Sequence, residues 1–304
     1  YGSVDSQFTI HLNHEYKTVK TPATLTKDGK IEEKCNCGDV KPVVIPAPKT
    51  FTLSTAEYTY NGKEKKPTVT VKDSKGKVLK NNKDYTVSYE KGRKSPGKYT
   101  VKITFKGDYK GEKRLYFTIN PKATTKISAT QTTSTVTLNW NKVTGADGYR
   151  VYKYNSKTKK YEKLKDVKET TLKISKLKAG TVYKYKVRAY TDDEGKIMGA
   201  YSKVFETATK CETPSITKLS SSKKGVVSFS WSNVSGESGY QVYYSTKKDS
   251  GFKKVDSYKI NVVKGSKKKL KSGKTYYFKV RAYKKTASGT VFSSWSKVKT
   301  VKVK

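Results

Sequence analysis

The sequence predicts an all-β chain: a linear array of small β-sandwiches preceded by a short β-hairpin segment. Apolar and polar residues alternate with period two in most stretches, and clusters rich in Gly, Asn, Asp and Ser separate those stretches. The 24 tyrosines far outnumber the 9 phenylalanines and 3 tryptophans, which is typical of half-buried strands. A length of 304 residues suits several small domains rather than one large core.

The charge of the chain comes almost entirely from lysine. Lys and Arg number 66 against 25 Asp and Glu, which gives a formal net charge of +41. Arginine occurs only at positions 93, 114, 150, 188 and 281. Since arginine rather than lysine makes the two-point contacts that read bases, a specific nucleic-acid partner is disfavoured, and a diffuse polyanion stays open. No apolar run reaches the length of a transmembrane helix, and we expect a monomer.

An internal repeat occupies the second half of the chain. Trp140 matches Trp231 at an offset of 91, and Arg188 matches Arg281 at an offset of 93. Each copy has a Trp that ends an alternating run, then a Gly-Tyr-x-Val run that begins at Gly148 or Gly239. A longer run follows in both copies, Leu-x-x-Gly-x-x-Tyr-x-(Tyr/Phe)-x-Val-Arg-Ala-Tyr. Such self-similarity indicates two homologous modules.

These motifs resemble those of fibronectin type III domains, over about residues 122–209 and 210–304. The resemblance implies a seven-strand sandwich in each copy. It also implies that Tyr183 and Tyr276 are tyrosine corners, in which a hydroxyl ties a loop to a strand.

Residues 49–121 contain further short alternating stretches, among them Asp84–Tyr89, Gly97–Phe105 and Arg114–Ile119. Their Lys-Asp-Tyr-Thr-Val-x-Tyr strand is similar to that of Ig-like repeats in surface proteins of Gram-positive, Firmicutes-type bacteria. The resemblance implies one more small sandwich, bracketed by prolines that favour extended linkers.

Residues 1–48 are expected to hold the end of a preceding domain and a hairpin adaptor. Phe8–Leu12 is predicted to be the last strand of that preceding domain. Lys27–Lys30 is predicted to be a turn between strands at Ala23–Thr26 and Ile31–Lys34.

The metal-ligand residue types cluster only near the start of the chain, at His11, His14, Cys35 and Cys37. Their spacing is poor for zinc, so a zinc site and ordinary turn residues or oxidisable thiols both stay open. Cys211 is expected to be a free thiol. Asp192–Gly195 reads as a hairpin tip, with weak calcium binding as the alternative.

No catalytic residue set and no cofactor are expected. Both histidines lie in the first 14 residues, so a nucleophile elsewhere would lack a histidine base. Paired carboxylates occur only as sequence neighbours. The chain is therefore expected not to be an enzyme.

The candidate ligand face follows from strand parity. If Tyr183, Tyr185, Val187 and Ala189 face inward, the intervening residues face outward beside the neighbouring strand. The resulting face combines basic and aromatic residues in both copies: Arg150, Tyr152, Lys184, Lys186, Arg188 and Tyr190, then Tyr243, Lys279, Arg281 and Tyr283. It suits anionic glycans, cell-wall polymers or host surface proteins, and the alternative is an ordinary solvated sheet face.

Taken together, the resemblances imply the C-terminal region of a multi-domain, secreted or cell-surface protein. We expect a non-catalytic stalk or adhesin-like array that displays or anchors a functional domain. The alternatives are a dedicated binding module and the accessory tail of a secreted enzyme.

Overall fold

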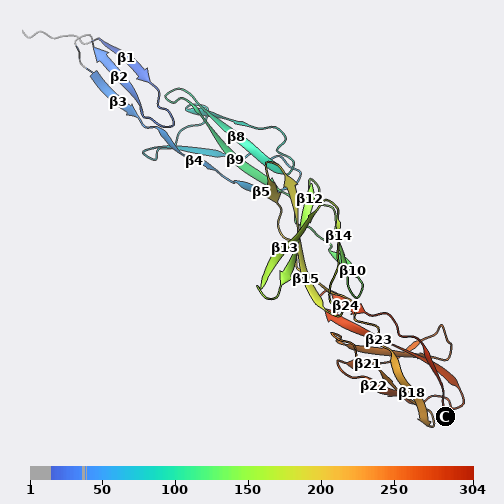
Figure 1. Ribbon diagram of the computed structural model, residues 1–304. Coiled ribbons are helices and arrows are strands. Elements are labelled where there is room, and N and C mark those ends of the chain that lie inside the picture. The colour runs from blue at the N-terminus through green and yellow to red at the C-terminus, as the bar shows by residue number, and fades with distance from the viewer. Residues whose placement is uncertain (1–14, 36–37, 39) are drawn as a thin grey trace, which may run out of the picture. The chain divides into compact units, whose positions relative to one another are not determined.

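The computed structural model describes residues 15–35, 38 and 40–304, and within them every regular element is a β-strand (Figure 1). The all-β prediction is confirmed. Two compact units divide the chain: Tyr1–Asn120 with Asp192–Ile197, and Pro121–Thr191 with Met198–Lys304. The described residues include no helix of the length and apolarity needed to cross a membrane.

The first sheet has three antiparallel strands rather than a plain hairpin: β1 (Tyr16–Thr21), β2 (Gly29–Cys35) and β3 (Val40–Ile45). The strand expected at Ala23–Thr26 was wrong, because β1 ends before Pro22 and Ala23 turns into the core. The Ala23 amide donates to the carbonyl of Asp108 at 2.9 Å. The predicted strand at Phe8–Leu12 lies outside the described residues.

The next block is a small sandwich, as the alternating stretches predicted. A two-stranded sheet, β4 (Pro48–Leu53) and β6 (Val69–Asp73), faces a four-stranded one. The latter has the order β5 (Glu57–Thr59), β9 (Glu112–Asn120), β8 (Gly97–Phe105), β7 (Tyr85–Tyr89). Burial alternates residue by residue along β8. Ala23 and Ile45 share a core with Val71 and Ile103, so the first sheet packs into this block.

The first copy of the repeat forms one three-stranded and one larger sheet. The smaller has the order β10 (Ser128–Gln131), β11 (Val136–Asn139), β14 (Thr171–Ile174). The larger contains β13 (Lys160–Val167), β12 (Gly148–Asn155), β15 (Val182–Asp192) and β16 (Lys196–Met198), and β17 (Phe205–Ala208) also pairs with β15.

The second copy repeats that topology. Its smaller sheet has the order β18 (Ile216–Lys223), β19 (Val226–Trp231), β22 (Lys264–Lys267). Its larger sheet contains β21 (Lys253–Lys259), β20 (Gly239–Ser245), β23 (Thr275–Thr286) and β24 (Gly289–Phe292), with β25 (Lys299–Lys302) also on β23. The boundaries between domains stay predictions.

The motif residues of the repeat fill equivalent places in the two cores. Trp140 and Trp231 are buried, each with a tyrosine ring at a centroid distance of 5.5 Å. The hydroxyl of Tyr183 accepts from the Lys178 amide at 3.0 Å, and that of Tyr276 from the Lys271 amide at 3.2 Å. Both tyrosine corners are therefore confirmed.

The last strand of each copy is split in two. In the first copy the break lies between β16 and β17, where Ser202 Oγ accepts from the Val187 amide at 3.0 Å. In the second copy the break lies between β24 and β25, where Ser296 Oγ accepts from the Val280 amide at 3.1 Å. A serine side chain thus takes the place of a ladder bond, and the residue before it lies over the sheet.

Candidate functional site

The predicted face of the first copy lies on the outer side of its larger sheet. Tyr185, Val187 and Ala189 are buried in the core, so Lys184, Lys186 and Arg188 on β15 point the other way. The antiparallel register places Arg150 opposite Arg188, and Tyr152 opposite Lys186. The two strands therefore bring the predicted residues together, and their role as ligand contacts stays a prediction.

Tyr190 and Tyr152 are buried, whereas strand parity predicts that both face outward. Tyr190 is 5% exposed, because its ring lies across Gly148 on the neighbouring strand, where a Cβ atom would meet the hydroxyl at 2.4 Å. Tyr152 is 9% exposed and packs edge-to-face on Tyr201 at a centroid distance of 5.1 Å. Parity predicts the face of a side chain and not its burial.

Aromatic rings that the sequence reasoning missed lie over the cations of this face. The Arg188 guanidinium carbon is 4.5 Å from the centroid of Tyr201. The Lys186 ammonium is 4.5 Å from the centroid of Tyr161 and 5.2 Å from that of Tyr201. Tyr201 lies in the break of the last strand, directly before Ser202. These distances are in the range of cation–π attraction.

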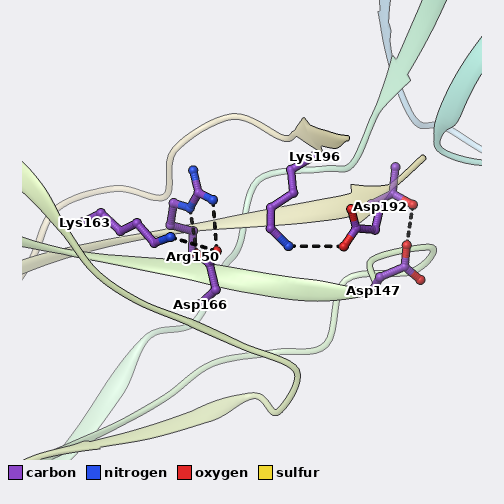
Figure 2. A network of polar contacts seen from close by, with 7 residues as sticks. Asp147, Arg150, Lys163, Asp166, Asp192 and Lys196 are labelled. Atoms are coloured by element: carbon purple, nitrogen blue, oxygen red, sulfur yellow. Dashed lines mark hydrogen bonds and ion pairs between the residues drawn. The ribbon is translucent and has the colours of Figure 1, made fainter. Parts of the chain in front are cut away.

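Two carboxylates flank the same face. Asp166 on β13 accepts two bonds from the Arg150 guanidinium, at 2.7 and 2.9 Å, and forms an ion pair with Lys163 at 3.1 Å (Figure 2). The hydrogen bonds from Arg150 lower the pKa of Asp166 to about 2, and the same pairing raises the pKa of Arg150. On β17, Glu206 forms an ion pair with Lys184 at 3.4 Å.

The second copy presents the equivalent face, with Lys279 and Arg281 at its centre. Tyr243 lies opposite Lys279, and Gln241 lies opposite Arg281. The Gln241 carbonyl oxygen accepts from Nε and from one terminal nitrogen of Arg281, at 3.0 and 2.8 Å. Tyr283 is half-buried and packs against Phe292 at a centroid distance of 6.3 Å.

Rings and cations alternate along this face, and we call the set Phe252, Lys279, Trp295, Arg281 and Phe292 the cation ladder. The Lys279 ammonium is 4.0 Å from the centroid of Phe252 and 4.6 Å from that of Trp295. The Arg281 guanidinium carbon is 3.7 Å from the centroid of Phe292 and 4.4 Å from that of Trp295. Trp295 precedes Ser296 as Tyr201 precedes Ser202, so the aromatic-Ser pair repeats at an offset of 94.

The cation ladder lacks the acids that flank the first face. Ser257 lies opposite Gln241, where the first copy has Asp166 opposite Arg150. Thr300 lies opposite Tyr277, where the first copy has Glu206 opposite Lys184.

The two cations of the ladder have no carboxylate partner in the described part of the chain. Among the described residues, no carboxylate lies within 4.0 Å of Lys279 or Arg281. Burial lowers the pKa of both groups, and the charge of Arg281 lowers the pKa of Lys279 further.

The other candidate chemistry is placed as follows. His11, His14 and Cys37 lie outside the described residues, and Cys35 is disulfide-bonded, so its sulfur is not a free thiolate. Cys211 is a buried free thiol, and burial raises its pKa to about 11. Asp192 ends β15 and pairs with Lys196 at 3.2 Å across a hairpin tip. In the described part of the chain, no group of three His, Cys, Asp or Glu residues is placed to hold a metal.

Comparison with known proteins bears on the first copy directly. Residues 120–203 match the family model of the fibronectin type III domain. No curated protein matches the sequence. Tandem fibronectin type III domains are commonly non-catalytic structural or interaction modules.

Solved structures similar to this chain include two from chicken. A segment of two fibronectin type III domains of tenascin is 18% identical, covering 60% of this chain and 99% of its own, with a TM-score of 0.37. The FN1–FN3 domains of CNTN1 are 15% identical, covering 85% of this chain and 100% of their own, with a TM-score of 0.36.

Proposed function

We propose that this chain is a non-catalytic, extracellular structural and interaction region. In this role it is a stalk or adhesin-like array that displays or anchors a functional domain at a bacterial surface. The observation that carries the proposal is the repeated bracing of the two copies. In each, a tyrosine corner fixes a loop, and an aromatic residue in the split last strand rests on the central cations. Such bracing supports a mechanical role for the two copies rather than a catalytic one.

A pulling experiment tests the structural role. The whole chain is held by its two ends in optical tweezers and extended at constant speed. Independent modules give separate unfolding events, and each fibronectin-like copy releases roughly 30 nm of chain at full extension. One cooperative event for the whole chain would contradict the proposal, because a stalk must keep its other modules folded when one opens.

A binding role is the second candidate, favoured by the two cations of the cation ladder, which have no carboxylate partner among the described residues. In this role the chain attaches to anionic glycans, cell-wall polymers or host surface proteins. Since attraction to a polyanion is screened by salt, the chain should be retained on immobilised dextran sulfate and released as NaCl rises. The same column made with neutral dextran is the control. Equal retention on both matrices would exclude an electrostatic binding role.

A further inference from the structure

The two copies of the repeat differ in how their central cations are surrounded. In the first copy, Glu206 lies on β17, which pairs with the strand of Lys186 and Arg188, and Asp166 lies on β13, one strand further away on the other side. In the second copy, the equivalent positions on the flanking strands are Ser257 and Thr300. On the first face these two carboxylates are held in ion pairs by Arg150 and Lys184. The second face has the uncharged Gln241 and Tyr277 in place of those cations and no carboxylate at the equivalent positions, so Lys279 and Arg281 are its central charges.

The positive charge on the second face is met by aromatic rings and a neutral amide, and by no carboxylate among the described residues. Arg281 interacts with the neutral side chains of Gln241 and Tyr243, and the neighbouring cation on the same strand is Lys279. Rings on either side exclude part of the surrounding water from both groups. A bound anion would relieve the repulsion between the two cations, which makes this pair a more favourable partner than solvated lysines elsewhere.

We propose that Lys279 and Arg281 form an anion-binding site whose ligand is a polysaccharide that carries sulfate or carboxylate groups. This assignment rests on the proposed binding role and names the site and the ligand class. Two cations two residues apart on one strand suit repeated negative charges along a polymer. Half-buried rings between and beside the cations offer apolar surface to sugar rings, a contact that a purely ionic polymer cannot use.

The test uses the whole 304-residue chain and a matched pair of variants. Lys279→Met with Arg281→Met removes both charges, while methionine keeps apolar contact with the rings. Lys186→Met with Arg188→Met makes the same change at the equivalent positions of the first copy. Both variants lose two positive charges, so diffuse attraction falls equally in each. Circular dichroism and thermal melting show whether each variant is folded.

Dissociation constants are measured for dextran sulfate, carboxymethyl dextran, neutral dextran and polyphosphate. We expect the change in the second copy to weaken binding of dextran sulfate about tenfold, and the change in the first copy to weaken it about twofold. A third variant, Ser257→Asp, introduces the acid that the first copy has at the equivalent position. It leaves the residues of the ladder unchanged and should also weaken binding. It keeps the test decisive if the methionine variant fails to fold.

The possible results distinguish failure of the proposed site from failure of the proposed binding role. If the wild-type chain binds none of the anionic polymers, the binding role fails and the site fails with it. If the wild type binds and the two methionine variants lose affinity equally, the binding role stands and the site is overturned. If polyphosphate binds as tightly as dextran sulfate and depends equally on Lys279 and Arg281, the ligand class is wrong.

Discussion

The guanidinium carbon of Arg281 lies 3.7 Å from the ring centroid of Phe292, and Trp295 covers the same group at 4.4 Å. The cation is thus held between one ring at the end of β24 and one ring in the break that follows it. Neither ring belongs to the strand that carries the arginine. The contact therefore joins the last strand to the centre of the sheet through side chains, where the backbone ladder is interrupted.

Trp295→Ala should destabilise the second copy, because it removes the ring that contacts both ladder cations and Tyr243. We expect the free energy of unfolding to fall by about 2 kcal/mol. Urea denaturation followed by circular dichroism measures it. Trp295→Tyr, which installs the residue type of the first copy, should recover most of the loss. A Trp295→Ala protein as stable as the wild type would show that the ring contacts contribute nothing.

Asp166→Asn should destabilise the first copy in a pH-dependent way. The folded-state pKa of Asp166 is about 2 and its ordinary value is 3.8, so the carboxylate stabilises the fold when ionised. This contribution is complete above about pH 5 and is lost as the pH falls through 2. We expect a difference in unfolding free energy of about 1–2 kcal/mol at pH 7 that is mostly lost by pH 2. A difference that is constant with pH would refute the charge-based explanation.

Removing the tyrosine-corner hydroxyls should cost stability, whereas removing a neighbouring hydroxyl should not. Tyr183→Phe deletes the acceptor of the Lys178 amide and should lower the unfolding free energy by about 1 kcal/mol. Tyr185→Phe is the matched control, since its buried hydroxyl has no hydrogen-bond partner among the described residues. It should be neutral or stabilising. Thermal melting of both variants checks the contrast, and equal losses would argue against the corner bond.

Gly148→Ala should destabilise the first copy more than a substitution at an exposed position does. A Cβ atom at Gly148 would lie 2.4 Å from the Tyr190 hydroxyl and 2.8 Å from the carbonyl oxygen of Val167. The Tyr190 ring must therefore leave its place across the strand, at a cost of about 2 kcal/mol. Gly195→Ala is a poor control because its φ is +118°. Ala200→Ser is a better one, and a melting temperature for Gly148→Ala equal to that of Ala200→Ser would contradict the packing argument.

The regular parts of the fold were predictable because half-buried strands alternate strictly. The stretch Gly97–Phe105 was expected as a strand and matches β8 residue for residue. The inward set on β15 follows from the same rule, and it placed Lys186 and Arg188 correctly on the outer face. Alternation is reliable wherever one face of a strand is buried and the other is solvated.

The remaining residues of the site could not be predicted from alternation, because they lie where the alternating pattern is interrupted. Tyr201 and Trp295 fall in the split last strands, and Asp166 follows a register shift in the pairing of β12 with β13. The aromatic-Ser pair repeated at an offset of 94 was a usable signal for the two rings. The sequence carried no such signal for Asp166, because a bulge changes the face of the sheet on which a residue lies.

The split last strand has a consequence for neighbouring copies of one module on a single chain. An uninterrupted last strand would offer a long row of unpaired amides and carbonyls to any similar sheet nearby. Here the pieces are β16 and β17 in one copy and β24 and β25 in the other, three or four residues each. Such short pieces give an incoming strand little length to pair with. Two homologous modules can then fold side by side during synthesis with less risk of exchanging strands.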